Sequence, residues 1–403
     1  MNSKIIDQFH LMLTGTTISN FHVGHKIGQG SFGEIYAIRS NIDSRLYALK
    51  VEPANTARKI LDFEVMVLKT VHRPNKNPNN INTNSPSRNN PSCNSRNSPS
   101  SSPDGSLCNS PYNSPYFPSL ISSGKTHTHA WYVMELLGPS LSTVTKLLPS
   151  HRLSLSTGLR VATLILRALK SFHESGFIHR DIKPENILLR RSREYPIAII
   201  DFGLSKVYID RKTGKLIPAR SHPGFRGTAV YASPNAHMHQ DLARRDDLIS
   251  WYYLVIDLLN GPLPWKLFES RAEILHLKRV LQMDELGGQI VPQFSDIWKL
   301  ISPLTYNDRP NYEEIEKLLL EAQAENGISM DDEDWDWHPQ ILQMDANDET
   351  FLEQQKQMND FVNAQDENMN HDVNDFDYVK KRKLSHQPLL GNQSEEGCCC
   401  LLL

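Results

Sequence analysis

The chain has 403 residues, of which 39% are hydrophobic, and its formal net charge at pH 7 is −3. This hydrophobic share is ordinary for a protein with a core, and no stretch approaches the roughly 18 to 20 apolar residues of a membrane-spanning helix. The first twenty residues lack the pattern of a secretory signal, and Cys93 and Cys108 lie in low-complexity sequence, which argues against a disulfide framework. These features predict an intracellular protein. No basic stripe runs along a predicted helix, so no nucleic-acid partner is expected.

Composition divides the chain into four segments. Residues 1–20 form a short lead-in, and residues 21–338 alternate patterns typical of strands and helices. Residues 339–379 are acidic and amide-rich and are predicted to form a flexible tail, and residues 380–403 hold a basic run and three adjacent cysteines. The folded segment is interrupted at about 74–116 by sequence rich in Asn, Ser and Pro, with too little apolar surface to offset the entropy of ordering.

Two interpretations of this interruption, the insert, stay open. It is predicted to be disordered, and it can be a passive expansion of a loop. Alternatively it is a phosphorylated segment, because it contains Ser-Pro pairs at Ser85, Ser98, Ser102, Ser110 and Ser114.

Strand patterns dominate the first part of the folded segment. Residues 21–40 and 45–52 are predicted as strands joined by turns, and residues 56–71 as a helix. After the insert, residues 129–136 are predicted as another strand.

Helical patterns dominate the second part. Residues 153–172 are predicted as a long amphipathic helix, and residues 196–200 as a buried strand that leads into the motif DFG. A strand-rich part followed by a helical part indicates an α+β fold of two lobes with a cleft between them.

Three glycines, Gly28, Gly30 and Gly33, lie between two predicted strands in IGQGSFGEI. The glycines of a dinucleotide site would open a helix instead. This position favours a hairpin that lies over phosphate groups and donates backbone N–H groups to them. Taken alone, the pattern is equally compatible with a structural hairpin.

Lys50 lies on the next predicted strand among apolar neighbours, where a lysine needs an anionic partner. The helix at 56–71 offers Glu64, which falls on its apolar face. We expect these two side chains to pair, either as a structural salt bridge or as part of a phosphate site.

The motif HRDIKPENILL carries the groups for phosphoryl transfer. Asp181 can accept the proton of an attacking hydroxyl, and Lys183 can neutralise the transferred group. Asn186 offers an amide oxygen to a divalent cation. Asp201 of DFG, fifteen residues further on, is a second oxygen ligand.

In this order and spacing, these motifs resemble the protein-kinase signature over roughly residues 21–338. The resemblance implies a two-lobed protein-kinase fold, protein substrates, and ATP and Mg²⁺ as cofactors. It assigns Lys50 to the phosphates, Asp181 to the base, and Asn186 and Asp201 to Mg²⁺. Around ATP it places Ile27, Gly28, Gln29, Gly30, Ser31, Phe32, Gly33, Ile35, Ala48, Lys50, Met134, Glu135 and Leu137, with Met134 as gatekeeper and residues 135–138 as hinge.

The segment after DFG departs from the commonest kinase pattern. Where most families have Ala-Pro-Glu, this chain has Ser233-Pro234-Asn235, and an asparagine cannot supply the charge that Arg309 would normally meet. Together with MELLGPSL, ARRDDL and GPLPW, this departure resembles the casein kinase 1 superfamily. The stretch GFRGT…YASPNAH and the later DWDW are similar to its tau-tubulin-kinase branch.

Val230 stands where casein kinase 1 has an arginine that helps to bind an anion near the substrate. A preference for pre-phosphorylated substrates is therefore not implied for this chain. Three basic residues lie nearby in the sequence and can compensate in part: Lys206, Arg220 and Arg226.

The resemblance favours an active serine/threonine kinase, expected to be monomeric. Lys183, two residues after Asp181, matches the serine/threonine pattern, and Thr228 would brace Asp181. One alternative is a pseudokinase scaffold, although such proteins usually lose the base, the strand lysine or the metal aspartate. A small-molecule kinase is a weaker alternative, because GTAVYAS resembles a peptide-positioning loop.

The sequence CCCLLL is expected to carry a lipid anchor. Cys400 with the three leucines fits the C-a-a-X form, and a final leucine favours a geranylgeranyl group. One lipid chain gives only reversible binding. The second signal would come from palmitoylation of Cys398 and Cys399 or from the basic residues 380–383 at an anionic leaflet.

This anchor would hold the kinase at the cytosolic face of a membrane, with residues 339–379 as the tether. Two other interpretations compete. The cysteines could form a metal knot, but three adjacent residues cannot complete a tetrahedral site alone. The run KKRK could be a nuclear-import signal, which would place the protein in the nucleus.

Overall fold

The structure is a computed structural model that describes residues 13–30, 33–54, 59–73 and 114–337. The acidic tail, the basic run, the three adjacent cysteines and most of the insert lie outside these ranges. The chain is described again from Ser114, and Tyr116 packs against the core, so the packed part resumes before the predicted end of the insert at 116. Among the described residues, no helix has the length and apolar character needed to cross a membrane.

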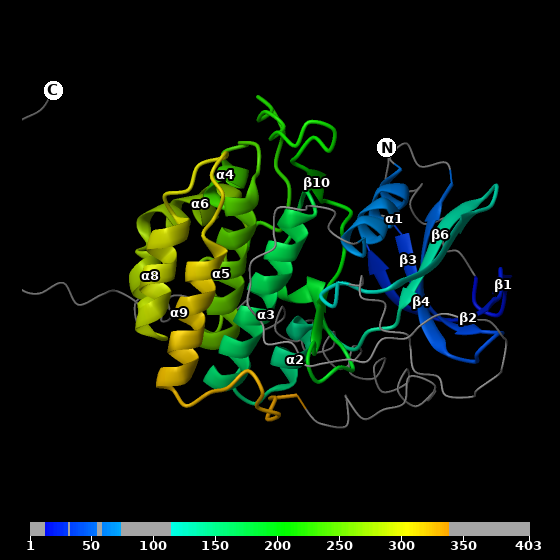
Figure 1. Cartoon of the computed structure of the whole chain (residues 1–403), viewed down its shortest axis with the longest axis horizontal. Helices are drawn as coiled ribbons and strands as arrows, with labels where there is room; N and C mark the ends of the chain where they lie inside the picture. Colours follow the sequence, from blue (N-terminus) through cyan, green and yellow to red (C-terminus); the bar gives the residue numbers. More distant parts are fainter. Residues whose placement is uncertain (1–12, 31–32, 55–58, 74–113, 338–403) are drawn as a thin grey trace, which may run out of the picture. The chain divides into compact units, whose positions relative to one another are not determined.

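The strand-rich lobe is one antiparallel sheet of six strands in the order β1-β2-β3-β4-β6-β5 (Figure 1). One face of the sheet buries alternate residues such as Val23, Ile38 and Val133 in a small core of its own. This alternation is the period-2 pattern expected of half-buried strands. The bounds are β1 Thr17–Ile18, β2 Phe21–Gly30, β3 Gly33–Ser40, β4 Leu46–Pro53, β5 Leu120–Lys125 and β6 His129–Glu135.

The other face of the sheet carries helix α1, Ile60–Val71, which contacts β5 and β6. The helix begins at Ile60 rather than at the predicted residue 56, and residues 55–58 lie outside the described ranges. It buries Glu64 and Val67, and Phe63 is half-buried. The carboxylate of Glu64 therefore faces inward, as the periodicity predicted.

The second lobe is helical and is built on α3, Leu155–Glu174, against which α5 and α9 pack. The helix α3 begins two residues after its predicted start because Ser154 caps it, accepting a hydrogen bond from the backbone N–H of Thr157. The other helices are α2 Leu141–Leu147, α4 Pro234–His237, α5 Arg244–Asn260, α6 Arg271–Val280, α7 Met283–Gly288, α8 Pro292–Ile301 and α9 Tyr312–Glu325.

Two short antiparallel strand pairs hold the segments that carry the motifs. Strand β7, Phe177–Ile178, pairs with β10, Lys206–Val207, and β8, Ile187–Leu189, pairs with β9, Ile197–Ile199. The motif HRD follows β7, and a short 3₁₀ turn at Pro184–Asn186 leads into β8. Both motif loops are therefore fixed at each end by strand pairing.

The two lobes are joined by an aromatic cluster. Phe117, which precedes β5, packs against Phe172 of α3 and against Phe202 of DFG at ring-centroid distances of 5.5 and 5.9 Å. Phe172 and Phe202 are stacked at 5.5 Å. All three rings are buried, so the position of DFG is fixed by packing as well as by its strand. The predicted α+β fold with a sheet lobe and a helical lobe is confirmed.

Residues 329–337 return across α3. The guanidinium of Arg160 is fully buried there and donates to the backbone carbonyls of Asp332 and Asp334. It also lies 4.0 Å from the centre of the Trp335 ring. The buried cation thus has both hydrogen-bond acceptors and an aromatic face.

Candidate active site

The loop that carries Asp181 is held by a buried carboxylate of α5. Asp247 accepts hydrogen bonds from the backbone N–H groups of His179 and Arg180, at 2.6 and 2.7 Å. His173 of α3 contacts the same carboxylate through its Nε2 atom at 2.9 Å. Burial would raise the pKa of Asp247, but the hydrogen bond from His173 and the nearby imidazoles outweigh burial and lower it. An ionised Asp247 therefore fixes the backbone immediately before Asp181.

Both carboxylate oxygens of Asp181 are held by residues predicted for the site. Its Oδ1 atom accepts hydrogen bonds from the backbone N–H and the hydroxyl of Thr228, at 2.9 and 2.8 Å. Its Oδ2 atom lies 3.0 Å from the ammonium of Lys183, which also donates to the hydroxyl of Thr228 at 3.1 Å. Asp181, Lys183 and Thr228 thus form one polar cluster, which aims the carboxylate in a fixed direction.

Gly227, directly before Thr228, allows this approach. Its φ is +94°, and a Cβ atom there would lie 2.6 Å from the backbone oxygen of Arg180. A side chain at this position would therefore separate the two segments that meet at Asp181.

Lys50 has acidic partners, as its position among apolar residues predicted. Its ammonium lies 2.7 Å from Oε1 of Glu64 and 3.5 Å from Oδ1 of Asp201. Burial would lower the pKa of Lys50, but the nearby acidic groups of Tyr132, Glu64 and Asp201 outweigh it and raise that pKa. The charged lysine joins the sheet lobe to the DFG motif, so the three residues are assembled across both lobes.

Tyr132 of β6 is a member of this cluster that the sequence analysis missed. Its hydroxyl donates to Oε2 of Glu64 at 3.2 Å, and the ring is buried. The residue lies opposite Lys50 in the pairing of β4 with β6. Only the register of these two strands could have identified it, and the sequence does not give that register.

The oxygens of Asn186 and Asp201 fit a divalent cation. The side-chain nitrogen of Asn186 donates to the backbone oxygen of Asp181 at 2.9 Å, which leaves its side-chain oxygen available to a cation. Burial would raise the pKa of Asp201, but the charge of Lys50 together with the neighbouring His179 and hydrogen bonds to Glu64 and Gly203 outweighs burial and lowers it, so the carboxylate is ionised. Hard oxygen donors of this kind suit Mg²⁺.

The glycine-rich hairpin reaches Lys50. Gly28 is paired with Ile35, and Gly30 with Gly33. A Cβ atom on Gly30 would lie 4.0 Å from the ammonium of Lys50, and one on Gly33 would lie 2.3 Å from a backbone oxygen of the next strand. Ser31 and Phe32, at the tip of the hairpin, lie outside the described residues.

The other residues expected around ATP come from neighbouring strands and the segment after them. Ala48 of β4 is paired with Met134 of β6, and both are buried. Leu137 is buried and Ile27 is half-buried. The remaining residues expected here, Gln29, Ile35 and Glu135, are described and lie on β2, β3 and β6.

Comparisons with known proteins agree with this geometry. The family model of the protein kinase domain matches residues 108–326. The chain belongs to the protein kinase family. A probable serine/threonine-protein kinase from Dictyostelium discoideum is 33% identical over 317 residues, which cover 78% of this chain and 56% of the relative.

Two further relatives of the kinase carry more specific names. The serine/threonine-protein kinase spe-6 from Caenorhabditis elegans is 29% identical over 320 residues, which cover 77% of this chain and 73% of the relative. The casein kinase I homolog RAG8 from Kluyveromyces lactis is 28% identical over 333 residues, which cover 80% of this chain and 54% of the relative. The kinase therefore spans little more than half the length of the first and third of these relatives.

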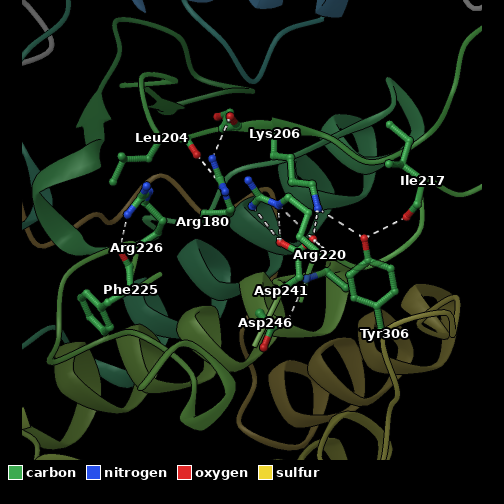
Figure 2. Close-up of polar contacts among 12 residues, drawn as sticks. Arg180, Leu204, Lys206, Ile217, Arg220, Phe225, Arg226, Asp241, Asp246 and Tyr306 are labelled. Atoms are coloured by element: carbon green, nitrogen blue, oxygen red, sulfur yellow. Dashed lines mark hydrogen bonds and ion pairs between the residues drawn. The ribbon is translucent and has the colours of Figure 1, made fainter. Parts of the chain in front are cut away.

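Two of the three basic residues expected near the substrate share one buried carboxylate (Figure 2). Asp241 accepts a hydrogen bond from Lys206 at 2.6 Å and from the Nη2 atom of Arg220 at 2.8 Å. Burial would raise the pKa of Asp241, but the hydrogen bonds from Arg220 and Lys206 outweigh burial and hold the pKa well below its usual range. Arg226, the third, is exposed and donates to the backbone oxygen of Phe225.

Arg180 of the HRD motif lies in the same region (Figure 2). It donates to the backbone oxygens of Leu204 and Ser205, at 2.5 and 3.2 Å. Burial and the cation of Arg220 lower the pKa of Arg180 to about 10. This arginine is thus satisfied by main-chain acceptors rather than by an acidic side chain.

Residues 227–233, the GTAVYAS segment that resembles a peptide-positioning loop, are held by Lys278 of α6. The lysine is buried, and its amine donates to the carbonyls of Ala229 and Ala232 at 2.7 and 2.6 Å. Burial lowers the pKa of Lys278 to about 6. A neutral amine still has two N–H groups, which matches the two carbonyls. This contact could not be predicted from the sequence, because nothing in the α6 sequence marks Lys278 as buried.

The segment Ser233-Pro234-Asn235 is held without the usual glutamate. Ser233 and Asn235 donate to the same oxygen of Asp246, at 2.6 and 2.8 Å. Arg309 instead lies within 4.0 Å of Glu174 and 3.8 Å of Glu313, with an exposed side chain. The arginine that usually meets the glutamate therefore contacts helices α3 and α9.

Proposed function

We propose that the chain is an active serine/threonine protein kinase that transfers the γ-phosphoryl group of ATP to hydroxyl groups of protein substrates. The observation that carries the proposal is the assembly of two clusters by residues distant in sequence. Lys50, Glu64 and Asp201 form one, and Asp181 with Lys183 and Thr228 forms the other. A pseudokinase does not transfer phosphate, so its function would not require both clusters.

Each residue then has a defined task. The carboxylate of Asp181, fixed on both oxygens, accepts the proton of the attacking hydroxyl. Lys183 lies beside it and offsets negative charge on the transferred group. Lys50, oriented by Glu64, binds the phosphates of ATP, and Asn186 and Asp201 would hold Mg²⁺. When bound, Mg²⁺ supplies charge neutralisation on the phosphate oxygens.

We further propose that the kinase is casein kinase 1-like and close to the tau-tubulin-kinase branch. The segment Ser233-Pro234-Asn235 supports this assignment, because Asp246 takes the hydrogen bonds of both polar residues and no glutamate is needed. The relative named as a casein kinase I homolog also supports it.

We propose that substrates need no prior phosphorylation. Val230 offers no charge, and Lys206 and Arg220 are already neutralised in part by Asp241. Each of the two cations already shares its charge with this carboxylate, which favours substrates that bring no anion of their own.

The test of activity is phosphoryl transfer by the full chain to a protein substrate such as casein, with the products identified by mass spectrometry. We expect transfer to Ser or Thr by the wild type and none by Asp181→Asn. The control is Asp296→Asn, which removes an exposed carboxylate of α8 that belongs to neither cluster. Equal background signals from wild type and Asp181→Asn, with both proteins folded, would identify a pseudokinase.

We also propose attachment to a cytosolic membrane leaflet. The proposal is supported by Cys398, Cys399 and Cys400 and by the basic run 380–383, which ends fifteen residues before them; all lie outside the described residues. The test is to fractionate cells that express the full chain or Cys400→Ser and to analyse the peptide that contains these cysteines. Unmodified cysteines in a wholly soluble protein would refute the anchor, and nuclear accumulation lost on mutation of the basic run would favour nuclear import.

A further inference from the structure

We propose that Arg190 positions the nucleotide-binding hinge of the kinase, because it clamps Glu135 and the chain that returns from the insert. The inference rests on the proposed function, in which residues 135–138 contact the adenine of ATP. Arg190 would touch neither ATP nor the substrate, so it is a positioning residue.

The contact between Arg190 and Glu135 is a two-point fork. Arg190 lies directly after β8 in the helical lobe, and Glu135 is the last residue of β6 in the sheet lobe. The Nε atom donates to Oε1 at 2.8 Å, and Nη2 donates to Oε2 at 2.9 Å. The side chains of Arg190 and Glu135 are 10% and 29% exposed. Two parallel bonds fix orientation as well as distance, which a single bond does not.

Arg190 also holds the segment between the insert and β5. Its Nη1 atom donates to the backbone oxygen of Pro115, and Nη2 donates to that of Phe117 at 2.7 Å. All three nitrogen atoms of the guanidinium are thus engaged by Glu135 and these carbonyls. The backbone N–H of Arg190 donates to the carbonyl of Pro196 at 2.7 Å, so the base of the side chain is fixed too.

Glu135 contacts the same returning segment on its own. Its backbone N–H donates to the carbonyl of Ser119 at 3.0 Å, and its Oε2 atom accepts from the N–H of Ser119 at 3.2 Å. His72, directly after α1, contacts the carbonyl of Pro118 at 3.0 Å. The start of the hinge, the end of the insert and the end of α1 therefore form one connected network. Arg190 ties this network to the helical lobe, beside the packing of Phe117 against Phe172.

Loss of the contact between Arg190 and Glu135 should weaken ATP binding and leave the rate of the chemical step unchanged. Asp181 is held independently by Thr228 and Lys183, and Asp247 holds the backbone before it. None of these residues contacts Arg190. Without the fork, the hinge would sample more orientations, and only a fraction of molecules would present the backbone geometry that binds adenine.

The experiment measures the Kd for ATP by calorimetry, and the KM for ATP and kcat in the transfer assay, all on the full chain. The variants are Arg190→Ala, Arg190→Lys, Glu135→Gln and the double variant Arg190→Ala/Glu135→Gln. The matched control is Arg193→Ala, three residues along, whose exposed guanidinium pairs with the exposed Glu333.

We expect Arg190→Ala to raise the Kd and KM for ATP about fivefold or more, which corresponds to the loss of one or two hydrogen bonds. Lysine cannot form the fork, so Arg190→Lys should be impaired as well. The double variant should be no worse than the worse single variant, because both changes break one contact. In the two Arg190 variants, the kcat at saturating ATP and the KM for the protein substrate should stay within about twofold of the wild type.

An unchanged Kd for ATP in a folded Arg190→Ala or Arg190→Lys protein would overturn the inference. So would additive losses in the double variant, or a fall in kcat with no change in Kd. If Arg190→Ala does not fold, Arg190→Lys and Glu135→Gln give the same decision. The calorimetric readout requires no phosphoryl transfer, so a wild type that binds ATP without transferring phosphate refutes the proposed function and leaves the inference to be judged on Kd.

Discussion

Tyr132 donates a hydrogen bond to the oxygen of Glu64 that does not face Lys50, so both carboxylate oxygens are satisfied inside the sheet lobe. Removal of the hydroxyl in Tyr132→Phe would leave one buried oxygen without this donor, at a cost of about 1 to 3 kcal/mol in the free energy of unfolding. Chemical denaturation of the two proteins measures the difference.

The matched control is Tyr47→Phe in the same sheet. The hydroxyl of Tyr47 donates to Asp43 at 2.9 Å in an exposed turn, where water can replace it. We expect a cost below about 0.5 kcal/mol there. Equal effects of the two substitutions would show that the burial of Glu64 is not what makes the Tyr132 contact important.

Thr228 should act on kcat. Thr228→Val removes the hydroxyl that binds both Asp181 and Lys183, and the carboxylate then loses part of its fixed direction. We expect kcat to fall about tenfold or more, with the KM for ATP little changed. Thr228→Ser keeps the hydroxyl and should recover most of the activity. Failure of serine to do so would indicate that the methyl group matters instead.

Lys50→Met should abolish transfer and leave the protein folded. The ammonium is the group that would bind phosphate, and loss of such electrostatic stabilisation typically costs several hundred-fold or more in rate. Steady-state assays and circular dichroism measure activity and folding. Because Glu64 would keep the hydrogen bond from Tyr132, gross unfolding of Lys50→Met would contradict this view of the cluster.

Deletion of residues 76–113 should leave activity largely intact, because the cost of closing a loop changes slowly with its length. The deletion ends before Ser114 because the next residue, Pro115, supplies a carbonyl to Arg190. We expect kcat and the KM for ATP within about threefold of the wild type. A large rise in the KM for ATP would show that the insert acts on the hinge.

The buried amine of Lys278 should make the free energy of unfolding depend on pH. Its pKa is lowered to about 6 in the folded protein, whereas an unfolded lysine keeps its proton up to about pH 10. Between these values the unfolded state binds more protons, so the free energy of unfolding should rise as pH increases from 6 to 10. Thermal unfolding at several pH values measures this slope. Lys278→Met should remove it, whereas Lys299→Met, on the exposed face of α8, should not.

The contacts that could be predicted from sequence are those in which one residue's surroundings demand a partner. Lys50 among apolar strand residues and Glu64 on an inward helix face form such a case, and they are paired at 2.7 Å. Asp181, Asn186 and Asp201 could be singled out for another reason, the order and spacing of the motifs that contain them. The start of α3 was missed by two residues, although Ser154 is a recognisable N-cap.

The contacts that escaped prediction depend on which segments the fold brings together. Arg190 is one of several arginines in a loop, and its sequence gives no sign that it reaches Glu135, 55 residues earlier. Asp241 and Lys278 are equally ordinary in sequence, yet each is buried and holds two partners. Such contacts require the tertiary arrangement, because neither periodicity nor spacing encodes them.

The contact of Arg160 with the main chain determines which sequence changes residues 329–337 can accept. Its acceptors at Asp332 and Asp334 include two backbone carbonyls, which every amino acid supplies. Substitution of these aspartates therefore leaves most of the contact in place, whereas insertion or removal of a single residue shifts both carbonyls away from the guanidinium. The segment behind α3 should consequently tolerate changes of side chain far better than changes of length, and a truncated protein lacking it would leave the guanidinium to its contacts with Ser156 and to solvent.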